Sequence, residues 1–588
     1  MVVFVCFAYD YRKEDVSVLR MINNLKAKPP KQIVDLRDLA RGCAEIFGDK
    51  PVYYYIENRE TKTCTYNQIW ENMNRLGQAL TKLDLLGKHV AVMGEVHPAY
   101  TTTYLSVVNG NGVIVPLDKE ISPEEIGGFF DFTDAEALFY TAGMNKHIAE
   151  IAKNAPNLRY FVAIQPDGEP FPDDRFLTYE DVLKMGDEEL AKGNDSYQHI
   201  ELDMEKMCAI ICTSGTTGTS KGVMLSQHNL TAAVNSCCLS MSYDDENTFV
   251  SVLPAHHTYE MTCTNLSLMN IGASVLVNDS LKHVLKNISE FKPNALVMVP
   301  LFLETMHKKI WAEIRKQGME KKVRAAMKVN AGLLDLGIDV REKLFGKITA
   351  AFGGNLKSIV CGGAPINPEI IKDFYHFGIT VLEGYGITEC SPLVAVNRPG
   401  HVKFHSVGTP VLNCEAKIDY DPGQETGEIL VKGDNVMLGY YKNPEATAAV
   451  FTEDGWFRTG DIGYMDKKGY IFITGRKKNV IILSNGKNVF PEELEEHLGK
   501  NPEILESVVL GRKKEDSDEI VITAIVVPNR DAEAIRGKTD EEIEAILTDI
   551  VTATNKKLPS FKHMTATEVR FTEFEKTSSR KIKRFKVK

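Results

Sequence analysis

Hydroxyl side chains and glycines crowd into one short stretch that directly follows an apolar run at residues 208–212. Thr213 to Gly222 contain six hydroxyl residues, three glycines and one lysine. Glycines let backbone N–H groups approach an anion, hydroxyls add uncharged donors, and Lys221 adds a positive charge. These residue types favour polyphosphate binding, although a plain polar turn has a similar composition. The Walker A pattern does not fit, because Gly222 stands where that pattern requires Ser or Thr.

Four later stretches also join glycine to residues that could bind a ligand. The first, at 361–365, is a turn after a predicted strand. The second, at 383–389, is a glycine-broken loop with an aromatic ring, a hydroxyl and a carboxylate. The third, at 456–461, ends in an aspartate, and the fourth, at 474–479, is a basic turn. Each alone is better explained by core packing or a solvated turn, so only their combination indicates a site.

Composition limits the class of protein. A chain of 588 residues is too long for one core, and 43% hydrophobic with 25% charged residues is typical of a globular protein. A net charge of −11 argues against a general nucleic-acid binder. The eleven cysteines include no C-x-x-C pair, which favours reduced thiols and a cytoplasmic location. No apolar run approaches the roughly 18–20 residues needed to span a bilayer.

The beginning of the chain has no clear targeting signal. Residues 1–9 are apolar, but no basic region precedes them and no cleavage site follows. We therefore interpret residues 1–20 as a non-native extension. Met21 is the expected start.

The elements that must position these residues follow a regular pattern between residues 208 and 400, where short apolar runs alternate with longer amphipathic segments. Such alternation predicts a parallel sheet with covered faces, and ligands then bind at the carboxyl ends of the strands. The residues at 127–134 are expected to form a loop. Strands are predicted at 89–93, 112–116, 208–212, 249–253, 273–277, 295–299 and 358–361, and helices at 229–241, 301–315 and 368–377.

The character of the sequence changes near residue 480. Helices are predicted at 491–498 and 540–558, and strands at 507–511, 520–527 and 567–572, which together suit a small α+β unit. The predicted fold class is therefore α/β, with a large N-terminal domain of layered, mostly parallel sheets and helices and a small mobile α+β C-terminal domain. The expected divisions are an N-terminal domain at 1–475, a hinge at 476–479 and a C-terminal domain at 480–588.

The C-terminal tail is strongly basic, with seven Lys or Arg among residues 576–588. A solvated charge run is the usual explanation of such a tail. A contact with a membrane surface or nucleic acid is a second interpretation. Delivery of a cation to bound phosphates is a third.

Five motifs occur in one order over more than 350 residues: 213–222, 384–389, 458–461, 475–476 and Lys581. Together they resemble the adenylate-forming superfamily of acyl-CoA synthetases, adenylation domains and luciferases, over nearly the whole chain. Within that superfamily, residues 374–377 and 383–397 look most like bacterial long-chain fatty acyl-CoA ligases.

This resemblance implies a reaction in two steps that uses ATP, Mg²⁺ and coenzyme A. A fatty acid carboxylate attacks the α-phosphorus of ATP, which gives an acyl-adenylate and pyrophosphate. The thiol of coenzyme A then attacks the acyl carbon and expels AMP. Two alternatives stay open, a fatty acyl–acyl-carrier-protein ligase and an aryl or medium-chain acyl-CoA ligase. A non-catalytic adenylate-binding protein is disfavoured, because Glu389, Asp461, Arg476 and Lys581 are all present.

The expected partners follow from the same resemblance. They are a fatty acid and coenzyme A, or an acyl carrier protein, with no nucleic acid and no transmembrane segment. The protein is expected to be a monomer or homodimer in the cytoplasm, with peripheral contact at the inner face of the membrane as an alternative.

The resemblance also assigns catalytic roles to individual residues. Lys581 would place a positive charge at the α-phosphorus, and loss of one such contact typically lowers a rate about 10²–10³-fold. Glu389, Thr388 and His257 would complete the catalytic set. Thr216 and Glu389 would ligate Mg²⁺, which prefers one or two protein oxygens together with phosphate oxygens.

Other positions match the moving parts of the family. Lys478 matches the hinge, and Asn485 and Gly486 match a loop that borders the thiol channel. The tail departs from the family pattern, because Glu575 and Arg580 replace its usual proline and glycine. The residues implied to bind ATP or AMP are Thr213, Ser214, Gly215, Thr216, Thr217, Gly218, Lys221, Gly363, Ala364, Pro365, Glu383, Gly384, Tyr385, Gly386, Thr388, Asp461 and Arg476.

Overall fold

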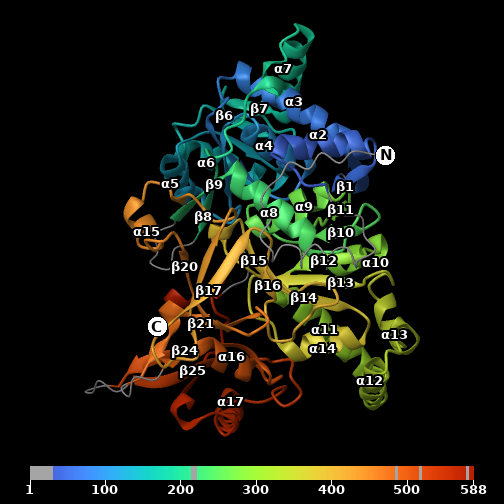
Figure 1. The fold of residues 1–588 in the computed structure, drawn as a ribbon, viewed down its shortest axis with the longest axis vertical. Coiled ribbons are helices and arrows are strands. Elements are labelled where there is room, and N and C mark those ends of the chain that lie inside the picture. The colour runs from blue at the N-terminus through green and yellow to red at the C-terminus, as the bar shows by residue number, and fades with distance from the viewer. Residues whose placement is uncertain are drawn as a thin grey trace.

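Two large mixed sheets form the body of the protein in a computed structural model that describes residues 31–57, 59–213, 221–483, 488–514, 520–577 and 582–587. Figure 1 shows the N-terminal elements at one end of the molecule and the C-terminal elements at the other. The first sheet has the order β19 (Gly439–Tyr440), β9 (Lys221–Ser226), β8 (Met207–Thr213), β4 (Val113–Leu117), β3 (His89–Met93), β5 (Ala135–Tyr140), β6 (Tyr160–Ala163) and β7 (Phe176–Thr178).

The second sheet is parallel in its centre and antiparallel at both edges. The strand of this sheet that comes first along the chain, β1, pairs in parallel with β11, which lies far along the sequence. The order is β16 (Thr409–Pro410), β15 (Leu393–Val396), β14 (Thr380–Gly386), β13 (Ser358–Gly362), β12 (Ala295–Met298), β10 (Thr248–Ser251), β11 (Ser274–Val277), β1 (Pro51–Glu57) and β2 (Glu60–Thr65).

Two buried helices, α4 (Pro98–Val108) and α8 (Gln227–Ser240), contribute to one core that also includes both sheets. Every residue of α4 is buried. Its threonines are tolerated there because Thr102 and Thr103 donate hydrogen bonds to carbonyl oxygens one turn earlier, at 2.9 and 2.7 Å. Because the core cluster joins Val92 of the first sheet, Leu105 of α4 and Val250 of the second sheet, the two sheets share one interior.

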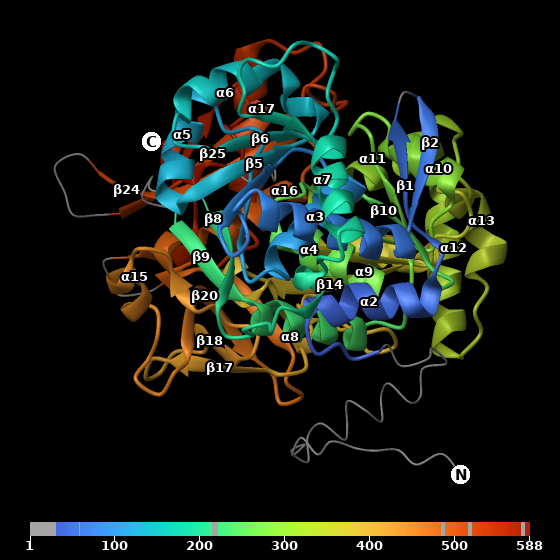
Figure 2. The ribbon, with the colours of Figure 1, turned by 90° about the horizontal axis from the view of Figure 1, so that it is seen from above.

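The remaining helices lie around this body (Figure 2). Of the helices in the described part of the chain, none is long and apolar enough to cross a bilayer. The helices around the two large sheets are α2 (Leu36–Phe47), α3 (Tyr66–Lys82), α5 (Pro123–Thr133), α6 (Ile148–Asn154), α7 (Tyr179–Ala191), α9 (Ser267–Asn270), α10 (Val284–Phe291), α11 (Pro300–Lys316), α12 (Glu320–Asp335), α13 (Arg341–Ala350), α14 (Pro368–His376) and α15 (Pro444–Ala448).

A four-stranded antiparallel sheet leads into the C-terminal unit. It has the order β17 (Cys414–Tyr420), β18 (Gly427–Gly433), β20 (Phe457–Met465) and β21 (Ile471–Arg476). The C-terminal unit packs its own core between three strands and two helices. These elements are β24 (Ile504–Lys513), β25 (Ile520–Pro528), β26 (Ala566–Val569), α16 (Pro491–Gly499) and α17 (Asp540–Asn555), preceded by the short strands β22 (Ile481–Ile482) and β23 (Asn488–Val489).

The predicted fold class is confirmed, and so is each predicted strand and helix, with small shifts at the ends. Three local predictions were wrong. Residues 127–134 are not a loop, because Ser122 caps α5, Pro123 begins it and acidic side chains follow in its first turn. The stretch at 383–389 begins as β14, whose backbone pairs with strands on both sides despite its glycines. The strand at 208–212 belongs to the first sheet, whereas its predicted neighbours form the second.

Candidate functional site

One cavity of about 2330 Å³ connects the two large sheets, the antiparallel sheet and the C-terminal tail. Strand ends of β8, β13 and β14 reach it, together with the loop after β10 and the segment after β21. The predicted site residues that line it are Thr213, Lys221, His257, Gly363, Gly384, Tyr385, Gly386, Thr388, Glu389, Arg476 and Lys478.

Other predicted residues lie elsewhere. Ala364 and Pro365 are exposed beside the cavity and do not line it. Asp461 and Glu383 lie behind its wall, and burial raises the pKa of Glu383 to about 8. Ser214, Gly215, Thr216, Thr217, Gly218, Asn485, Gly486 and Lys581 lie outside the described residues, so their roles stay predictions.

A buried carboxylate ties together three strands at the wall of the cavity. Asp461 on β20 lies opposite Arg476 on β21 in the strand register, and Arg476 Nε is 2.7 Å from Asp461 Oδ1. The hydroxyl of Tyr385 on β14 donates to Asp461 Oδ2 at 2.6 Å. Burial, and then the negative charge of Asp461, raise the pKa of Tyr385, so that its hydroxyl remains a donor. The arrangement fixes an aromatic ring and a guanidinium on the same cavity wall.

A second carboxylate gathers a tyrosine and a lysine from distant parts of the chain. Tyr440 of β19 donates its hydroxyl hydrogen to Glu389 Oε1 at 2.9 Å. The ammonium of Lys221 lies 4.3 Å from the centre of the Tyr440 ring, which is a favourable cation–π distance. Glu389 Oε2 accepts no hydrogen bond within the described part of the chain. The cluster therefore combines one available carboxylate oxygen with a positive charge.

Sequence reasoning missed Tyr440, because a tyrosine after a glycine carries no signal of its own. Pairing of β19 with β9 brings this tyrosine beside Lys221. In the sequence, only the hydroxyl-glycine stretch at 213–222 indicated that this end of the sheet could bind a ligand.

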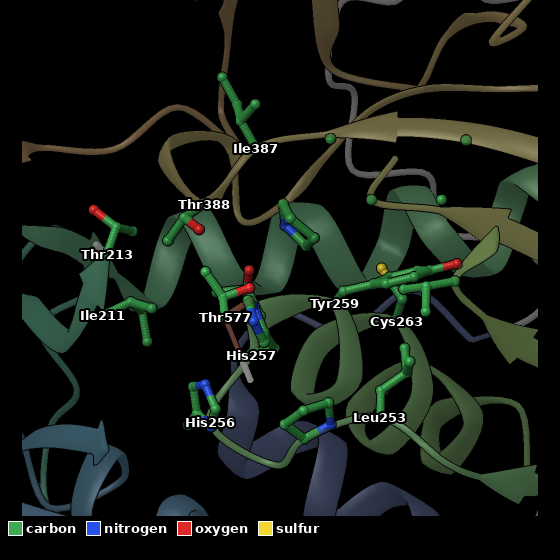
Figure 3. Close-up of a pocket in the computed structure, with 18 of the residues that line it drawn as sticks. Ile211, Thr213, Leu253, His256, His257, Tyr259, Cys263, Ile387, Thr388 and Thr577 are labelled. Carbon is green, nitrogen blue, oxygen red and sulfur yellow. The ribbon is translucent and has the colours of Figure 1, made fainter. Parts of the chain in front are cut away.

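Two adjacent histidines lie where the cavity turns toward its apolar part. The His256 and His257 rings are 4.8 Å apart, and His256 Nε2 is 3.7 Å from Asp118 Oδ2. Burial lowers the pKa of His256, which favours its neutral form. Figure 3 shows His257 together with Thr388 and with Thr577 of the C-terminal tail. The tail therefore reaches the same chamber as the predicted nucleotide-binding residues.

Tail residues on both sides of the predicted lysine also line this cavity. Thr577 precedes it, and Ile582 and Lys583 follow it. The segment is held by a bridge between Lys576 and Ile582 and by an ion pair between Arg584 and Glu495. The described residues of the tail are therefore held by contacts and do not form a frayed end.

The apolar part of the cavity extends between α8, α9, α10 and α11. Sequence patterns could not identify it, because its residues come from many separate elements and resemble ordinary core positions. Figure 3 shows Cys263 and Tyr259 in its wall. Its apolar lining includes Cys237, Cys238, Met241, Val252, Leu253, Leu268, Ile271, Val277, Val284, Leu285, Val297, Val299, Phe302 and Met306.

A fully buried glutamate supports the wall of this apolar part. Glu260 lies in the π-helix at Tyr259–Leu266 and accepts hydrogen bonds from Ser251 and from Asn265 Nδ2. Its second oxygen has no partner in the described structure, and burial raises the pKa of Glu260 to about 7. The folded protein therefore favours the neutral carboxyl.

We expect Glu260→Gln to remove a pH-dependent loss of stability. Below pH 4.5 the carboxyl is protonated in both states and the stability is fully present. As pH rises toward and through 7, the wild type should lose about 3 kcal/mol of unfolding free energy, because only its unfolded state ionises freely. Urea denaturation at pH 5.5 and pH 8 would measure this. The control is Glu290→Gln, which changes an exposed glutamate of α10. Equal pH slopes in wild type and Glu260→Gln would contradict the expectation.

Comparisons with known proteins gave matches over both the N-terminal and the C-terminal part of the chain. Residues 41–441 match the sequence model described as AMP-binding enzyme, and residues 478–588 match the AMP-binding enzyme C-terminal domain. The chain is 30% identical over 433 residues to "Probable acyl-activating enzyme 16, chloroplastic" of Arabidopsis thaliana, which covers 63% of this chain and 59% of that protein.

Two other relatives match over more of their length. The long-chain-fatty-acid–CoA ligase FadD15 of Mycobacterium tuberculosis is 29% identical over 447 residues, covering 73% of this chain and 72% of that protein. The long-chain-fatty-acid–[acyl-carrier-protein] ligase AEE15 of A. thaliana is 26% identical over 576 residues, covering 86% and 78%. The crystal structure of anthranilate CoA ligase AuaEII with anthranoyl-AMP shares the fold, with a TM-score of 0.73, 20% identity and coverage of 96% and 98%.

Proposed function

The chain belongs to the AMP-binding enzyme family, and from this premise we propose that it activates a fatty acid with ATP and transfers the acyl group to coenzyme A. Enzymes of this family use ATP, Mg²⁺ and coenzyme A, as the sequence led us to expect. One observation carries the proposal. A single cavity joins a polar chamber of carboxylates and cations to a long apolar part.

The polar chamber suits a nucleotide. The Tyr385 ring offers a flat surface and Arg476 offers a donor near the ribose position, while Asp461 behind the wall anchors both. Lys221 supplies a cation for the β- and γ-phosphates at the start of β9. Gly363 has a φ of +85°, which favours glycine and lets this backbone approach a ligand closely.

The donor set of the second carboxylate also fits a magnesium ion. Glu389 presents one oxygen without a described partner to the cavity, and Mg²⁺ prefers such an oxygen together with phosphate oxygens. When bound, Mg²⁺ would neutralise phosphate charge that otherwise repels the attacking carboxylate. Tyr440 holds Glu389 in place from the protein side.

The proposed reaction then takes place in two steps. In the first step the fatty acid carboxylate forms a bond to the α-phosphorus, and the bond to pyrophosphate breaks. His257 lies where the apolar part meets the polar chamber, so it can position that carboxylate. Lys581, carried by the tail, stabilises negative charge at the phosphorus. In the second step the thiol loses its proton and its sulfur bonds to the acyl carbon, while the bond from that carbon to the AMP oxygen breaks and AMP leaves with its electrons.

The hinge is proposed at Lys478, between β21 and β22. Lys478 lines the cavity, and burial together with the charge of Arg476 lowers its pKa. Rotation about this point would withdraw the tail after the first step and admit the thiol for the second. A few residues at an element terminus are sufficient for such a hinge.

The test is ATP–pyrophosphate exchange with a panel of fatty and aryl acids, followed by transfer to coenzyme A or to an acyl carrier protein. We expect exchange with long-chain acids and a thioester with coenzyme A. The relative named as an acyl-carrier-protein ligase supports the second candidate, which would be favoured by transfer to the carrier protein alone. No exchange with any carboxylic acid would refute both.

Chain-length selectivity should depend on Leu268 of α9, which lines the apolar part of the cavity and is buried. Leu268→Phe adds volume there, so it should lower kcat/KM for a sixteen-carbon acid about 10-fold relative to an eight-carbon acid. The ratio of the two values cancels any loss of folded enzyme. An unchanged ratio would show that the acyl chain does not reach Leu268.

A further inference from the structure

The helical projection formed by α12 and α13 exposes an unusual number of apolar side chains. Leu336 is 75% exposed, Val329 60%, Ile338 49% and Leu344 44%. Single exposed apolar residues are common, but four on one projection indicate a contact surface. Figure 1 shows α12 and α13 projecting at the edge of the molecule opposite the antiparallel sheet.

The outward face of α12 has an ordered pattern. Met327 and Asn330 are buried on its inner side. Ala325, Val329 and Leu336 form an exposed apolar stripe on the other side, at helical spacing. Such a face satisfies no packing requirement of the chain itself.

Lysines flank this stripe. Residues 315–347 contain nine basic and four acidic residues, although the whole chain carries a net charge of −11. Two of the four acids are already paired, Glu320 with Arg324 and Asp339 with Arg341. In the described part of the chain, no ion pair involves Lys321, Lys322, Lys328, Lys343 or Lys347.

The apolar part of the cavity reaches the surface at the same edge. Leu281 and Leu301, which line it, are 54% and 44% exposed, and Lys309 is also among its lining residues. Leu301 and Lys309 belong to α11, and α12 packs against another face of that helix, where Arg324 lies over Trp311. Figure 2 shows α10, α11, α12 and α13 gathered on one side.

We propose that the α12–α13 surface binds a membrane that contains anionic lipid, and that fatty acid enters the cavity from it beside Leu281 and Leu301. We define this surface as Lys321, Lys322, Ala325, Lys328, Val329, Leu336, Ile338, Lys343, Leu344 and Lys347. The inference that fatty acid enters from the membrane rests on the proposed function, whereas the inference that this surface binds a membrane does not.

Charge and shape select this occupant. Lysines at an apolar stripe match an anionic interface, where apolar side chains enter the acyl boundary and ammonium groups meet phosphates. A second copy of the chain would bring the same lysines together, which opposes association through this surface. Nucleic acid would use the lysines but leave the four exposed apolar side chains without a partner.

The experiment is flotation of the full chain with vesicles of phosphatidylcholine alone or with 30% phosphatidylglycerol. We expect binding only to the anionic vesicles and its loss in 0.5 M NaCl. Val329→Asp with Leu336→Asp should lower the bound fraction at least 10-fold. The matched control, Val34→Asp with Ile46→Asp, changes two apolar residues that are 72% and 59% exposed and should bind like the wild type.

Several results would overturn the proposal. They are equal binding of both double variants, equal binding to neutral vesicles, or a dimer in solution that the Val329/Leu336 variant dissociates. Loss of binding only on removal of residues 576–588 would assign the contact to the tail instead. Exchange activity with dissolved octanoate should be the same in both variants. Absence of exchange with every acid of the panel in the wild type would refute the proposed function while leaving the flotation result intact.

Discussion

Replacing Lys581 by alanine is expected to lower the adenylation rate by about 10²–10³-fold or more while sparing the second half-reaction. The expectation rests on the proposed role of Lys581 and on Thr577, Ile582 and Lys583, which flank it in the sequence and line the cavity. Negative charge grows at the α-phosphorus only in the first step. Thioester formation from supplied acyl-adenylate should therefore stay within a few-fold of the wild type.

The measurement is single-turnover kinetics of each half-reaction. Lys586→Ala is the matched control, because this tail lysine pairs with Glu575 at 2.5 Å and does not line the cavity. An exposed ion pair of this kind contributes little, so both rates should be close to normal. Equal losses in both half-reactions for Lys581→Ala would contradict a tail that acts in one step only.

Asp461→Asn is expected to raise KM for ATP about 10²-fold. Asp461 is 3% exposed and receives both the Tyr385 hydroxyl and the Arg476 guanidinium. Asn removes the negative charge that the Tyr385 hydroxyl and the half-exposed Arg476 guanidinium both contact, and a hydrogen bond to a charged group typically contributes about 1.5–3 kcal/mol. The Tyr385 ring and the Arg476 cation, which we propose flank the nucleotide, then lose their common anchor.

Equilibrium binding of ATP and initial-rate kinetics would measure this effect. Asp466→Asn, one residue after β20, is the control, because Asp466 pairs with Lys403 away from the cavity. We expect nearly normal KM in that variant. If Asp461→Asn changed only the unfolding free energy and left KM unaltered, Asp461 would be a structural residue alone.

The sequence was sufficient for elements with strong local patterns. The strand at 295–299 and the helix at 301–315 could be predicted because apolar period and a proline boundary agree there. The helix at α5 could not, since two adjacent glycines, Gly127 and Gly128, mask a capped and acidic first turn. Tertiary pairing overrode the glycines of β14 in the same way.

The site residues were predictable only where they belong to a recognisable sequence motif. Tyr385, Glu389 and Arg476 line or border one chamber, as their motifs indicated. Tyr440 and Leu268 reach that cavity through strand pairing and helix packing, which no local spacing encodes. The α12–α13 surface was equally hidden, because an exposed apolar stripe and a buried one have the same period.

The pairing of β1 with β11 has a consequence for the order in which the protein can form. Tyr53 of β1 lies opposite Val275 of β11, and the other neighbour of β1 is the edge strand β2. The hairpin of β1 and β2 ends at Thr65, so during synthesis 210 further residues must follow before Val275 of its parallel neighbour is made. Long-range parallel pairing of this kind forms slowly. A ribosome-bound chain shorter than residue 275 thus exposes this hairpin, which makes it a natural point of contact for a chaperone.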